Sequence, residues 1–241
     1  MTESFIDKVK LADLAASFGV LLDETALERF DCYAKLLCDW NEKINLTAIT
    51  DPEEIVVKHF ADSLSVLQAV SPAQGASLMD VGTGAGFPGL ALKIARPDLR
   101  VTLLDSTQKK LLVLEDIAQK LGLTVDLLHK RAEEAGRDPL YREQFDFATA
   151  RAVANLRELA EYCLPFVRVG GRFLAMKSAK TDAELDEAKA AVRLLGGKVV
   201  AVHAVSLPQA GERTVVELEK RSPTPAPYPR PSAKIARFPL K

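Results

Sequence analysis

From residue 75 onward the sequence alternates short apolar runs with helical segments, and this alternation limits the fold more than any other feature. Seven runs have the length and the aliphatic content of strands: 77–81, 101–105, 125–129, 145–149, 172–176, 198–205 and 214–218. Amphipathic helical patterns lie between several of them. Strands that are nearly continuously apolar and alternate with helices predict an α/β fold, with a parallel sheet covered by helices on both faces.

The residues before this alternation are helical in pattern. Apolar side chains recur at three- and four-residue spacing from Leu27 to Trp40, which places them on one helix face. Asp51 and Pro52, with a carboxylate following, have the arrangement that begins a helix: a capping side chain and a proline in the first turn. We expect this second helix to run to about Ala69.

Charge is balanced over the whole chain but divided unevenly along it. There are 32 Lys and Arg against 33 Asp and Glu, a net charge of -1. This balance excludes a protein that coats nucleic acid non-specifically, yet it permits a local basic patch. The last residues are basic and rich in proline, so we expect them to be extended and irregular. The regions we expect are a helical cap over 1–74, a core over 75–220 and a tail over 221–241.

Several classes of protein are excluded by what the sequence lacks. Cys32, Cys38 and Cys163 are too few and too irregularly spaced for a disulfide framework, and no His/Cys/Asp cluster has metal-ligand spacing, so we expect no metal. The first residues have no apolar leader, and no run reaches the ~18 apolar residues of a membrane span. We therefore expect a cytoplasmic protein with no membrane partner, and a monomer because nothing indicates an obligate oligomer.

The strongest local signal is a glycine-rich turn after the first predicted strand, where 78–89 reads LMDVGTGAGFPG. Glycines let a ligand approach the backbone, and the first strand-to-helix turn of such a sheet lies at the edge where ligands bind. The spacing is GxGxG, which does not fit the dinucleotide pattern GxGxxG. Asp105, at the end of the second strand, is suited to accept hydrogen bonds from a ribose diol.

The acid at Asp80, just before the turn, separates the two cofactors that need such a ribose contact. A carboxylate that points toward the pocket would repel the pyrophosphate of NAD(P). The same carboxylate could meet the cationic amino-acid end of S-adenosylmethionine (SAM). We therefore expect SAM as the cofactor, and an NAD(P)-dependent Rossmann oxidoreductase is the first alternative.

The end of the fourth predicted strand indicates the kind of methyl acceptor. Sites that methylate exocyclic amines commonly place an Asn/Asp-Pro-Pro-aromatic element there, and carbon methylation of pyrimidines uses a cysteine. Segment 145–152 reads FDFATARA and has neither. Arg151 offers a planar donor fork for a carboxylate, a phosphate or the Hoogsteen edge of guanine. Guanine N7 suits a site without an evident general base, because its lone pair is free at neutral pH.

Seven short segments, in order along nearly the whole chain, form a specific combination. They are WNEKINLT at 40–47, HFADSL at 59–64, DVGTGAGFPG at 80–89, LLDS at 103–106, RA at 151–152, MK at 176–177 and GER at 211–213. Together they resemble the RsmG/GidB family, the bacterial 16S rRNA guanine-N7 methyltransferases. The resemblance implies a class I SAM-dependent methyltransferase fold: a Rossmann-like, mostly parallel seven-stranded sheet with helices on both faces and an N-terminal helical cap.

The resemblance also implies an activity and a set of site residues. The activity is methyl transfer from SAM to N7 of a guanine in the decoding-region loop of 16S rRNA, with the small ribosomal subunit or its assembly intermediate as partner. Arg151 would sit at the junction of cofactor and substrate and position both, with no general base. The other implied or expected cofactor-binding residues are Gly82, Phe87, Asp105, Ala132 and Glu133, and the RNA-binding residues are Lys177 and Arg213.

Some interpretations stay open at this point. His59 lies beside Asp62 on a helix face and is either a hydrogen-bonding residue of the cap or a substrate contact. His129 and His203 fall in predicted strands, where a structural role is more common than ligand binding. The second alternative for the whole chain is a non-catalytic ribosome-binding module that has kept the fold.

Overall fold

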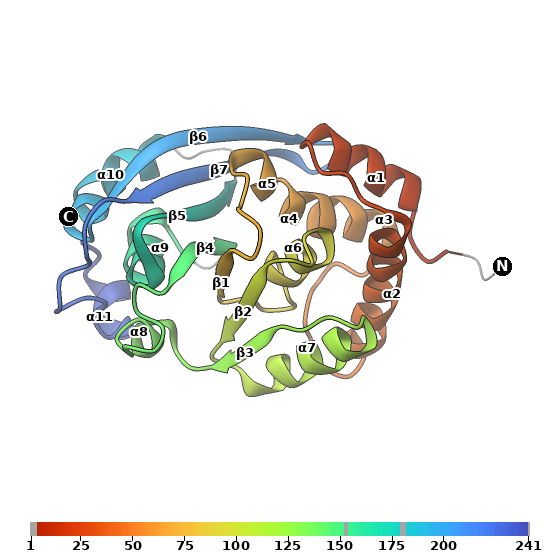
Figure 1. Cartoon of the computed structure of the whole chain (residues 1–241), viewed down its shortest axis with the longest axis horizontal. Coiled ribbons are helices and arrows are strands. Elements are labelled where there is room, and N and C mark those ends of the chain that lie inside the picture. Colours follow the sequence, from red (N-terminus) through yellow and green to blue (C-terminus); the bar gives the residue numbers. More distant parts are fainter. Residues whose placement is uncertain (1–3, 152–153, 179–181, 241) are drawn as a thin grey trace.

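The computed structural model describes residues 4–151, 154–178 and 182–240, which form a seven-stranded sheet with helices on both sides (Figure 1). Every one of the predicted strands is present, and several are longer than the sequence pattern indicates. The strands are β1 Ser77–Val81, β2 Arg100–Asp105, β3 Asp126–His129, β4 Phe145–Arg151, β5 Val167–Ser178, β6 Gly197–Leu207 and β7 Gly211–Lys220.

The strand order determines which residues meet at one edge of the sheet. The order is β3-β2-β1-β4-β5-β7-β6, and β7 is antiparallel to both of its neighbours while the other pairs are parallel. Strands β1 to β5 therefore end at the same edge, and β7 begins there, with Arg213 opposite Ser178. The predicted, mostly parallel sheet is confirmed.

The helices follow the predicted pattern closely. The helix expected over 52–69 begins at the cap Asp51, whose carboxylate accepts from the backbone N–H of Glu54, and it contains a π-helical stretch. In the described part of the chain, none of the helices has the length and apolar content that crossing a membrane requires. The helices are α1 Lys8–Ser17, α2 Glu24–Asn41, α3 Pro52–Glu54, η1 Ile55–Ala61, α4 Asp62–Leu64, α5 Val66–Ala69, α6 Gly89–Ala95, α7 Gln108–Lys120, α8 Ala132–Ala135, α9 Leu156–Cys163, η2 Leu164–Phe166, α10 Asp182–Leu194 and α11 Ser232–Arg237.

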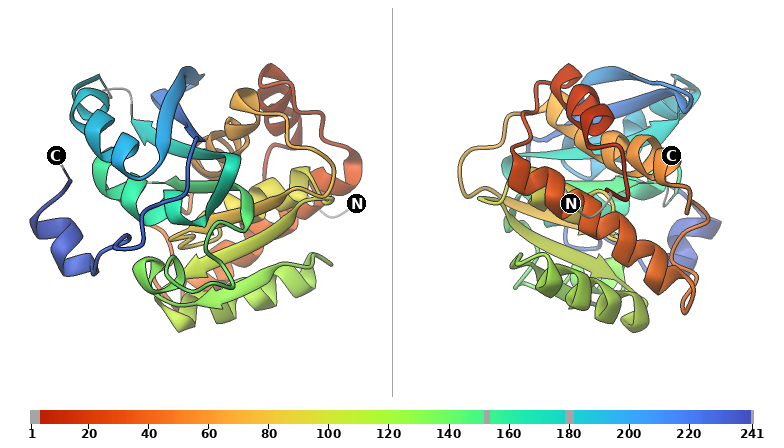
Figure 2. Two further views of the ribbon diagram at one scale, coloured as in Figure 1. Left: turned by 60° about the vertical axis from the view of Figure 1, so that its left-hand side comes forward. Right: turned by 90° about the vertical axis from the view of Figure 1, so that its right-hand side faces the viewer.

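Two hydrophobic clusters form, one on each face of the sheet. Leu78 belongs to the cluster shared with α1, α2, η1 and α4 to α7, while its neighbour Met79 belongs to the cluster shared with α8, α9 and α10. Successive strand residues point to opposite faces, so a strand apolar at every position is buried on both sides. The N-terminal helices and the C-terminal segment accordingly lie on opposite sides of the sheet (Figure 1, Figure 2).

The tail differs from the sequence expectation in one respect. It was expected to be extended and irregular, but residues Ser232–Arg237 form the short helix α11. Pro231 precedes the first turn, and Ile235 is fully buried, so tertiary packing stabilises a helix that the proline-rich composition conceals. The N-terminal helices share one continuous hydrophobic cluster with the sheet, so no separate core marks a boundary near residue 75. The boundaries expected at residues 75 and 221 stay a prediction.

Candidate active site at the carboxyl edge of the sheet

The glycine-rich turn after β1 is organised by the side chain of Asp80. Its Oδ2 accepts hydrogen bonds from Thr83 Oγ1 at 2.7 Å and from Gly89 N at 2.8 Å. A Cβ at Gly89 would lie 2.7 Å from the same oxygen, so only glycine fits at the start of α6. Asp80 was expected to face the pocket, but it is completely buried and faces the turn. Burial raises the pKa of Asp80 to about 6.

The N-terminal cap closes the other side of this turn through Tyr33 of α2. The Tyr33 hydroxyl donates to the carbonyl oxygen of Ala85 at 2.6 Å. Gly86 has a φ of +96°, and a Cβ there would lie 2.4 Å from the Tyr33 hydroxyl oxygen. Both the backbone conformation and the close approach require glycine. The cap is therefore part of what shapes the turn.

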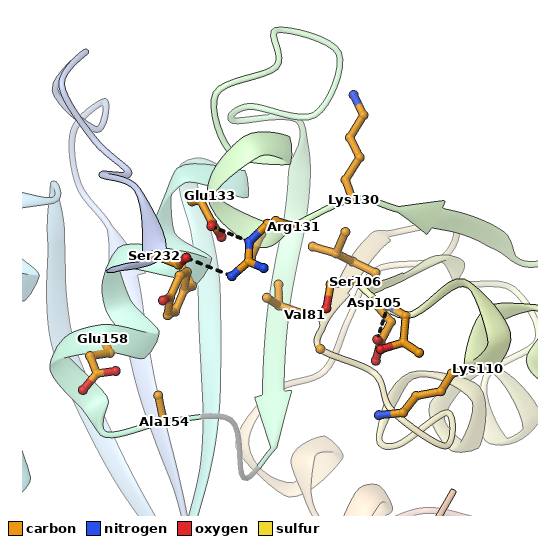
Figure 3. A pocket seen from close by; sticks show the side chains of 15 residues that line it. Val81, Asp105, Ser106, Lys110, Lys130, Arg131, Glu133, Ala154, Glu158 and Ser232 are labelled. Carbon is orange, nitrogen blue, oxygen red and sulfur yellow. Dashed lines mark hydrogen bonds and ion pairs between the residues drawn. The ribbon is translucent and has the colours of Figure 1, made fainter. Parts of the chain in front are cut away.

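A pocket of about 370 Å³ lies beyond the carboxyl ends of β1, β2 and β3 (Figure 3). Four of the residues expected at the cofactor site line it, namely Gly82, Asp105, Ala132 and Glu133. The Asp105 carboxylate is oriented by two backbone N–H groups: Gly84 N lies 3.0 Å from Oδ2 and Thr107 N lies 2.8 Å from Oδ1. Each oxygen keeps a further lone pair for a ligand hydroxyl, because an ionised carboxylate has about four acceptor sites.

The opposite wall of this pocket includes three side chains joined by hydrogen bonds, an arrangement that the sequence did not predict. Figure 3 shows the Arg131 guanidinium between Glu133 and Ser232; Nε donates to Glu133 Oε1 at 2.8 Å and an NH2 donates to Ser232 Oγ at 2.8 Å. Burial alone would raise the pKa of Glu133, but the hydrogen bond from Arg131 holds it below its ordinary value. Arg131 and Ser232 are 101 residues apart, so no local pattern could have paired them.

A second pocket, of about 500 Å³, lies where the cap meets β4, β5 and β7. It brings together three of the expected residues: Arg151 from the end of β4, Lys177 from the end of β5 and Arg213 from the start of β7. Arg151, expected at the junction of cofactor and substrate, lines only the second pocket. The full lining is Ile49, Lys58, His59, Asp62, Arg151, Met176, Lys177, Ser178 and Arg213.

Arg151 is held from several directions by the helix that carries His59 and Asp62. One NH1 donates to Asp62 Oδ2 at 2.9 Å and to the Lys58 carbonyl oxygen at 3.1 Å. An NH2 lies 3.3 Å from His59 Nδ1. The ion-pair partner of Arg151 is therefore Asp62, 89 residues earlier in the chain. These contacts fix the guanidinium and leave Nε–H and one NH2 hydrogen without a partner among the described residues.

His59 links Arg151 to the segment at 40–47. Its Nε2 lies 2.9 Å from Thr47 Oγ1, and Asn41 Oδ1 in turn accepts from the backbone N–H of Thr47 at 3.0 Å. Burial, followed by the charge of Arg151, lowers the pKa of His59 to about 3. A neutral ring that accepts from Arg151 at Nδ1 carries its proton on Nε2 and donates it to Thr47. His59 is thus a hydrogen-bonding residue of the cap that also lines the pocket.

Phe87 lies beneath this arrangement and does not line the first pocket. Its ring stacks on His59 with centroids 4.4 Å apart, and the Arg151 guanidinium lies 4.9 Å from the ring centroid. Phe87 is only 3% exposed. The residue expected to border the cofactor therefore supports Arg151 and His59 from below, by stacking and a cation–π contact.

Lys177 lies between the two pockets. Its ammonium donates to the carbonyl oxygen of Ala154, which lines the first pocket, at 2.9 Å, and it pairs with Glu184 at 2.9 Å. The Lys177 side chain is only 12% exposed, against 32% for Arg213. Most of the charge of Lys177 is therefore used within the protein, whereas Arg213 is more available to a ligand.

The two remaining histidines lie outside both pockets. His203 Nε2 is 3.0 Å from Glu217 Oε2, and His129 Nε2 is 3.1 Å from the Ser106 carbonyl oxygen. Within residues 4–151, 154–178 and 182–240, no group of three or more His, Cys, Asp or Glu side chains is arranged to hold a metal ion.

The depressed pKa of His59 predicts a specific pH dependence of stability. In the folded protein the ring stays neutral down to about pH 3, whereas in the unfolded chain it takes up a proton below about 6.5. The free energy of unfolding should therefore fall as the pH drops from about 6.5 toward 3, by about 2 kcal/mol between pH 7 and pH 5. Urea denaturation of the His59→Gln variant should show a flatter profile over this interval, while His129→Gln, at an exposed histidine, should behave like wild type. Equal slopes in all three proteins would contradict the assignment.

The strand order and the turn at the end of β1 place the protein in the class of Rossmann-like, SAM-dependent methyltransferases. A solved SAM-dependent O-methyltransferase from Thermotoga maritima has the same fold, with a TM-score of 0.53 and 15% identity over 78% of this chain and 73% of that chain. The family model described as rRNA small subunit methyltransferase G (GidB) matches residues 26–216.

Relatives from other bacteria match almost the full chain. Ribosomal RNA small subunit methyltransferase G of Exiguobacterium sp. is 49% identical over 224 residues, which is 92% of this chain and 94% of the relative. That of Acetivibrio thermocellus is 46% identical over 232 residues, 95% of each. The chain belongs to the GidB family, and the resemblance found in the sequence is confirmed. It is a methyltransferase that uses SAM.

Proposed function

We propose that this protein transfers the methyl group of SAM to N7 of a guanine in the decoding-region loop of 16S rRNA. Its relatives are named ribosomal RNA small subunit methyltransferases, which supports the small ribosomal subunit or its assembly intermediate as the partner. We further propose that it acts in the cytoplasm as a monomer. The NAD(P) oxidoreductase alternative has no support in the family match.

The first pocket suits SAM in size and chemistry. Its volume of about 370 Å³ falls in the usual range for small-molecule sites. Asp105 would accept hydrogen bonds from the ribose hydroxyls, Gly82 would let the ligand reach the backbone, and Ala132 and Glu133 would flank the adenosyl group. When bound, SAM supplies a methyl group on a positively charged sulfur. Three carboxylates (Asp105, Glu133 and Glu158) and three basic side chains (Lys110, Lys130 and Arg131) line the pocket, which suits a ligand that carries both a cationic amino group and sulfur and an anionic carboxylate.

The second pocket suits a guanine. The free donors of Arg151 can bind O6, which leaves the adjacent N7 unobstructed for attack on the methyl group. Arg213, at the more open side of the pocket, can pair with a phosphate of the RNA backbone, and Lys177 would hold the wall between the two ligands. Catalysis then depends on holding N7 and the methyl group in line at contact distance.

One observation carries the choice of N7: the titratable groups of the second pocket are already engaged. Both His59 nitrogens have partners, and Asp62 is paired with Arg151. No described residue there is therefore free to remove a proton. An acceptor with a free lone pair needs no such residue. The Asp62 carboxylate, only 6% exposed, can also offset the positive charge that develops on the base.

Mapping the modified atom tests this proposal. The purified protein should, with SAM and unmethylated small subunits, produce one site in 16S rRNA that borohydride and aniline cleave, because this treatment cuts at N7-methylguanine. Samples without SAM provide the control. Methyl incorporation without cleavage would assign a different acceptor atom. Binding to subunits without any methyl transfer would favour the non-catalytic module.

A further inference from the structure

The C-terminal segment, described over residues 221–240, lies outside the stretch matched by the family model, yet it packs against the first pocket. Ser232, the first residue of α11, is one of the residues that line that pocket. Helix α11 also contacts α9, the helix that contributes Glu158 and Tyr162 to the pocket. The segment is therefore placed where it can influence ligand binding.

Arginines of the core hold the extended part of this segment by its backbone. Arg142 donates to the carbonyl oxygens of Thr224 at 2.6 Å and Tyr228 at 2.8 Å. Arg137 donates to the carbonyl oxygens of Pro227 at 2.8 Å and Pro229 at 2.6 Å. The chain leading to α11 thus has a defined path, whereas its proline-rich composition predicts only that it is extended.

A buried ion pair then anchors the segment next to the pocket. Glu161 of α9 is fully buried and accepts from Arg230 three times: from the backbone N–H at 2.9 Å, from Nε at 2.8 Å and from NH2 at 2.6 Å. Such a bidentate pair fixes direction as well as position. Arg230 lies two residues before Ser232, so its ion pair with Glu161 determines the position of the Ser232 hydroxyl.

The Ser232 hydroxyl completes the wall of the pocket through Arg131. It accepts from the Arg131 NH2 at 2.8 Å, while the Nε of the same guanidinium donates to Glu133. The Arg131 side chain is 56% exposed, so without Ser232 it would have only Glu133 to restrict it among the described residues. The hydrogen bond that Ser232 accepts therefore fixes a side chain that lines the first pocket (Figure 3).

We propose that the C-terminal segment is a structural part of the cofactor pocket, in which Ser232 holds Arg131 and Glu133 in place against the adenosine moiety. This inference rests on the proposed binding of SAM in the first pocket. Ser232 and Arg230 are positioning residues: they preorganise the wall and take no part in methyl transfer. Of the basic side chains of the tail, Arg230 is paired with the buried Glu161, whereas Lys234 and Arg237 are exposed.

The test uses calorimetry to compare the affinity for SAM of the full-length protein, of point variants and of a shortened chain. Ser232→Ala should raise the Kd for SAM about five-fold, the equivalent of one hydrogen bond, and a chain that ends after Pro231 should raise it about ten-fold or more. Ser232→Thr keeps a hydroxyl and should restore most of the affinity. Lys234→Ala is the matched control, because Lys234 is exposed on the same helix and does not line the pocket.

Steady-state kinetics separate this role from a general structural one. The KM for SAM should rise in Ser232→Ala, while kcat at saturating SAM and the KM for small subunits stay within about two-fold of wild type. An unchanged Kd in Ser232→Ala would overturn the inference, even if the shortened chain were unstable. A loss of subunit affinity with unchanged SAM affinity would assign the tail to RNA and also overturn it. If the wild-type protein itself does not bind SAM, the proposed function is wrong. If wild type and Ser232→Ala bind SAM equally well, only the inference about the tail is wrong.

Discussion

Replacing Arg151 by alanine is expected to reduce methyl transfer by about two to three orders of magnitude, the usual effect of removing a donor that acts at the reacting centre. The donors proposed to hold guanine O6 belong to this side chain, whereas the other guanidinium of the second pocket, that of Arg213, is proposed to bind a phosphate. The measurement is single-turnover transfer of a labelled methyl group to small subunits. Wild-type activity in this variant would contradict the proposed role.

The Arg151→Ala variant needs a control for stability. Asp62 is buried, and burial raises its pKa while Arg151 opposes that rise, so loss of Arg151 leaves a buried carboxylate with only the more distant Arg213, at 3.8 Å, as an ion-pair partner. Breaking one side of such a pair commonly costs about 3–5 kcal/mol. The double variant Arg151→Met with Asp62→Asn should regain most of the thermal stability but none of the activity. Recovery of activity together with stability would show that Arg151 acts only through the fold.

Asp105→Ala is expected to raise the Kd for SAM by about 100-fold. Hydrogen bonds to a charged acceptor contribute about 1.5–3 kcal/mol each, and this carboxylate is the proposed partner of the ribose hydroxyls. The variant also frees the backbone N–H groups of Gly84 and Thr107, so the turn loses its orientation. Isothermal titration with SAM and with S-adenosylhomocysteine measures the effect.

Asp126→Ala provides the matched control for Asp105→Ala. Asp126 is an exposed carboxylate on the neighbouring strand β3, and it does not line the first pocket. Its removal changes the net charge equally but should leave the Kd within about two-fold of wild type. If both variants bind SAM with equal affinity, the ribose contact must be made elsewhere.

The segment at 40–47 illustrates how a sequence motif can act at a distance. Its residues carried much of the resemblance to the family, but nothing in their order says what they do. In the structure Asn41 positions Thr47, Thr47 contacts His59, and His59 lies against Arg151. The motif therefore acts on the second pocket through a chain of hydrogen bonds that only a folded cap can assemble.

Asp80 and Phe87 show where reasoning from the sequence reaches its limit. Both were correctly placed in the turn that borders the first pocket, but the direction of each side chain was not predictable. Asp80 turns inward because the N–H of Gly89 and the hydroxyl of Thr83 offer it partners, and Phe87 turns toward Tyr33 and His59 of the cap. These partners come from helices and turns whose relative position is a property of packing.

The sequence alone was sufficient for the mostly parallel sheet and for the edge at which the site lies, because hydrophobic periodicity is local and strands of one direction place their ends at one edge. The choice of SAM was also correct, although one of its premises, that Asp80 faces the pocket, was wrong. The sequence also placed Gly82, Asp105, Ala132 and Glu133 in a single site, and those four do line one pocket. Packing over long sequence distances determined the rest: the separation of Arg151 from that pocket, its ion pair with Asp62, and the contact of Ser232 with Arg131. These depend on pairs that are 89 and 101 residues apart, and the burial that brings them together leaves no periodic signal in the sequence.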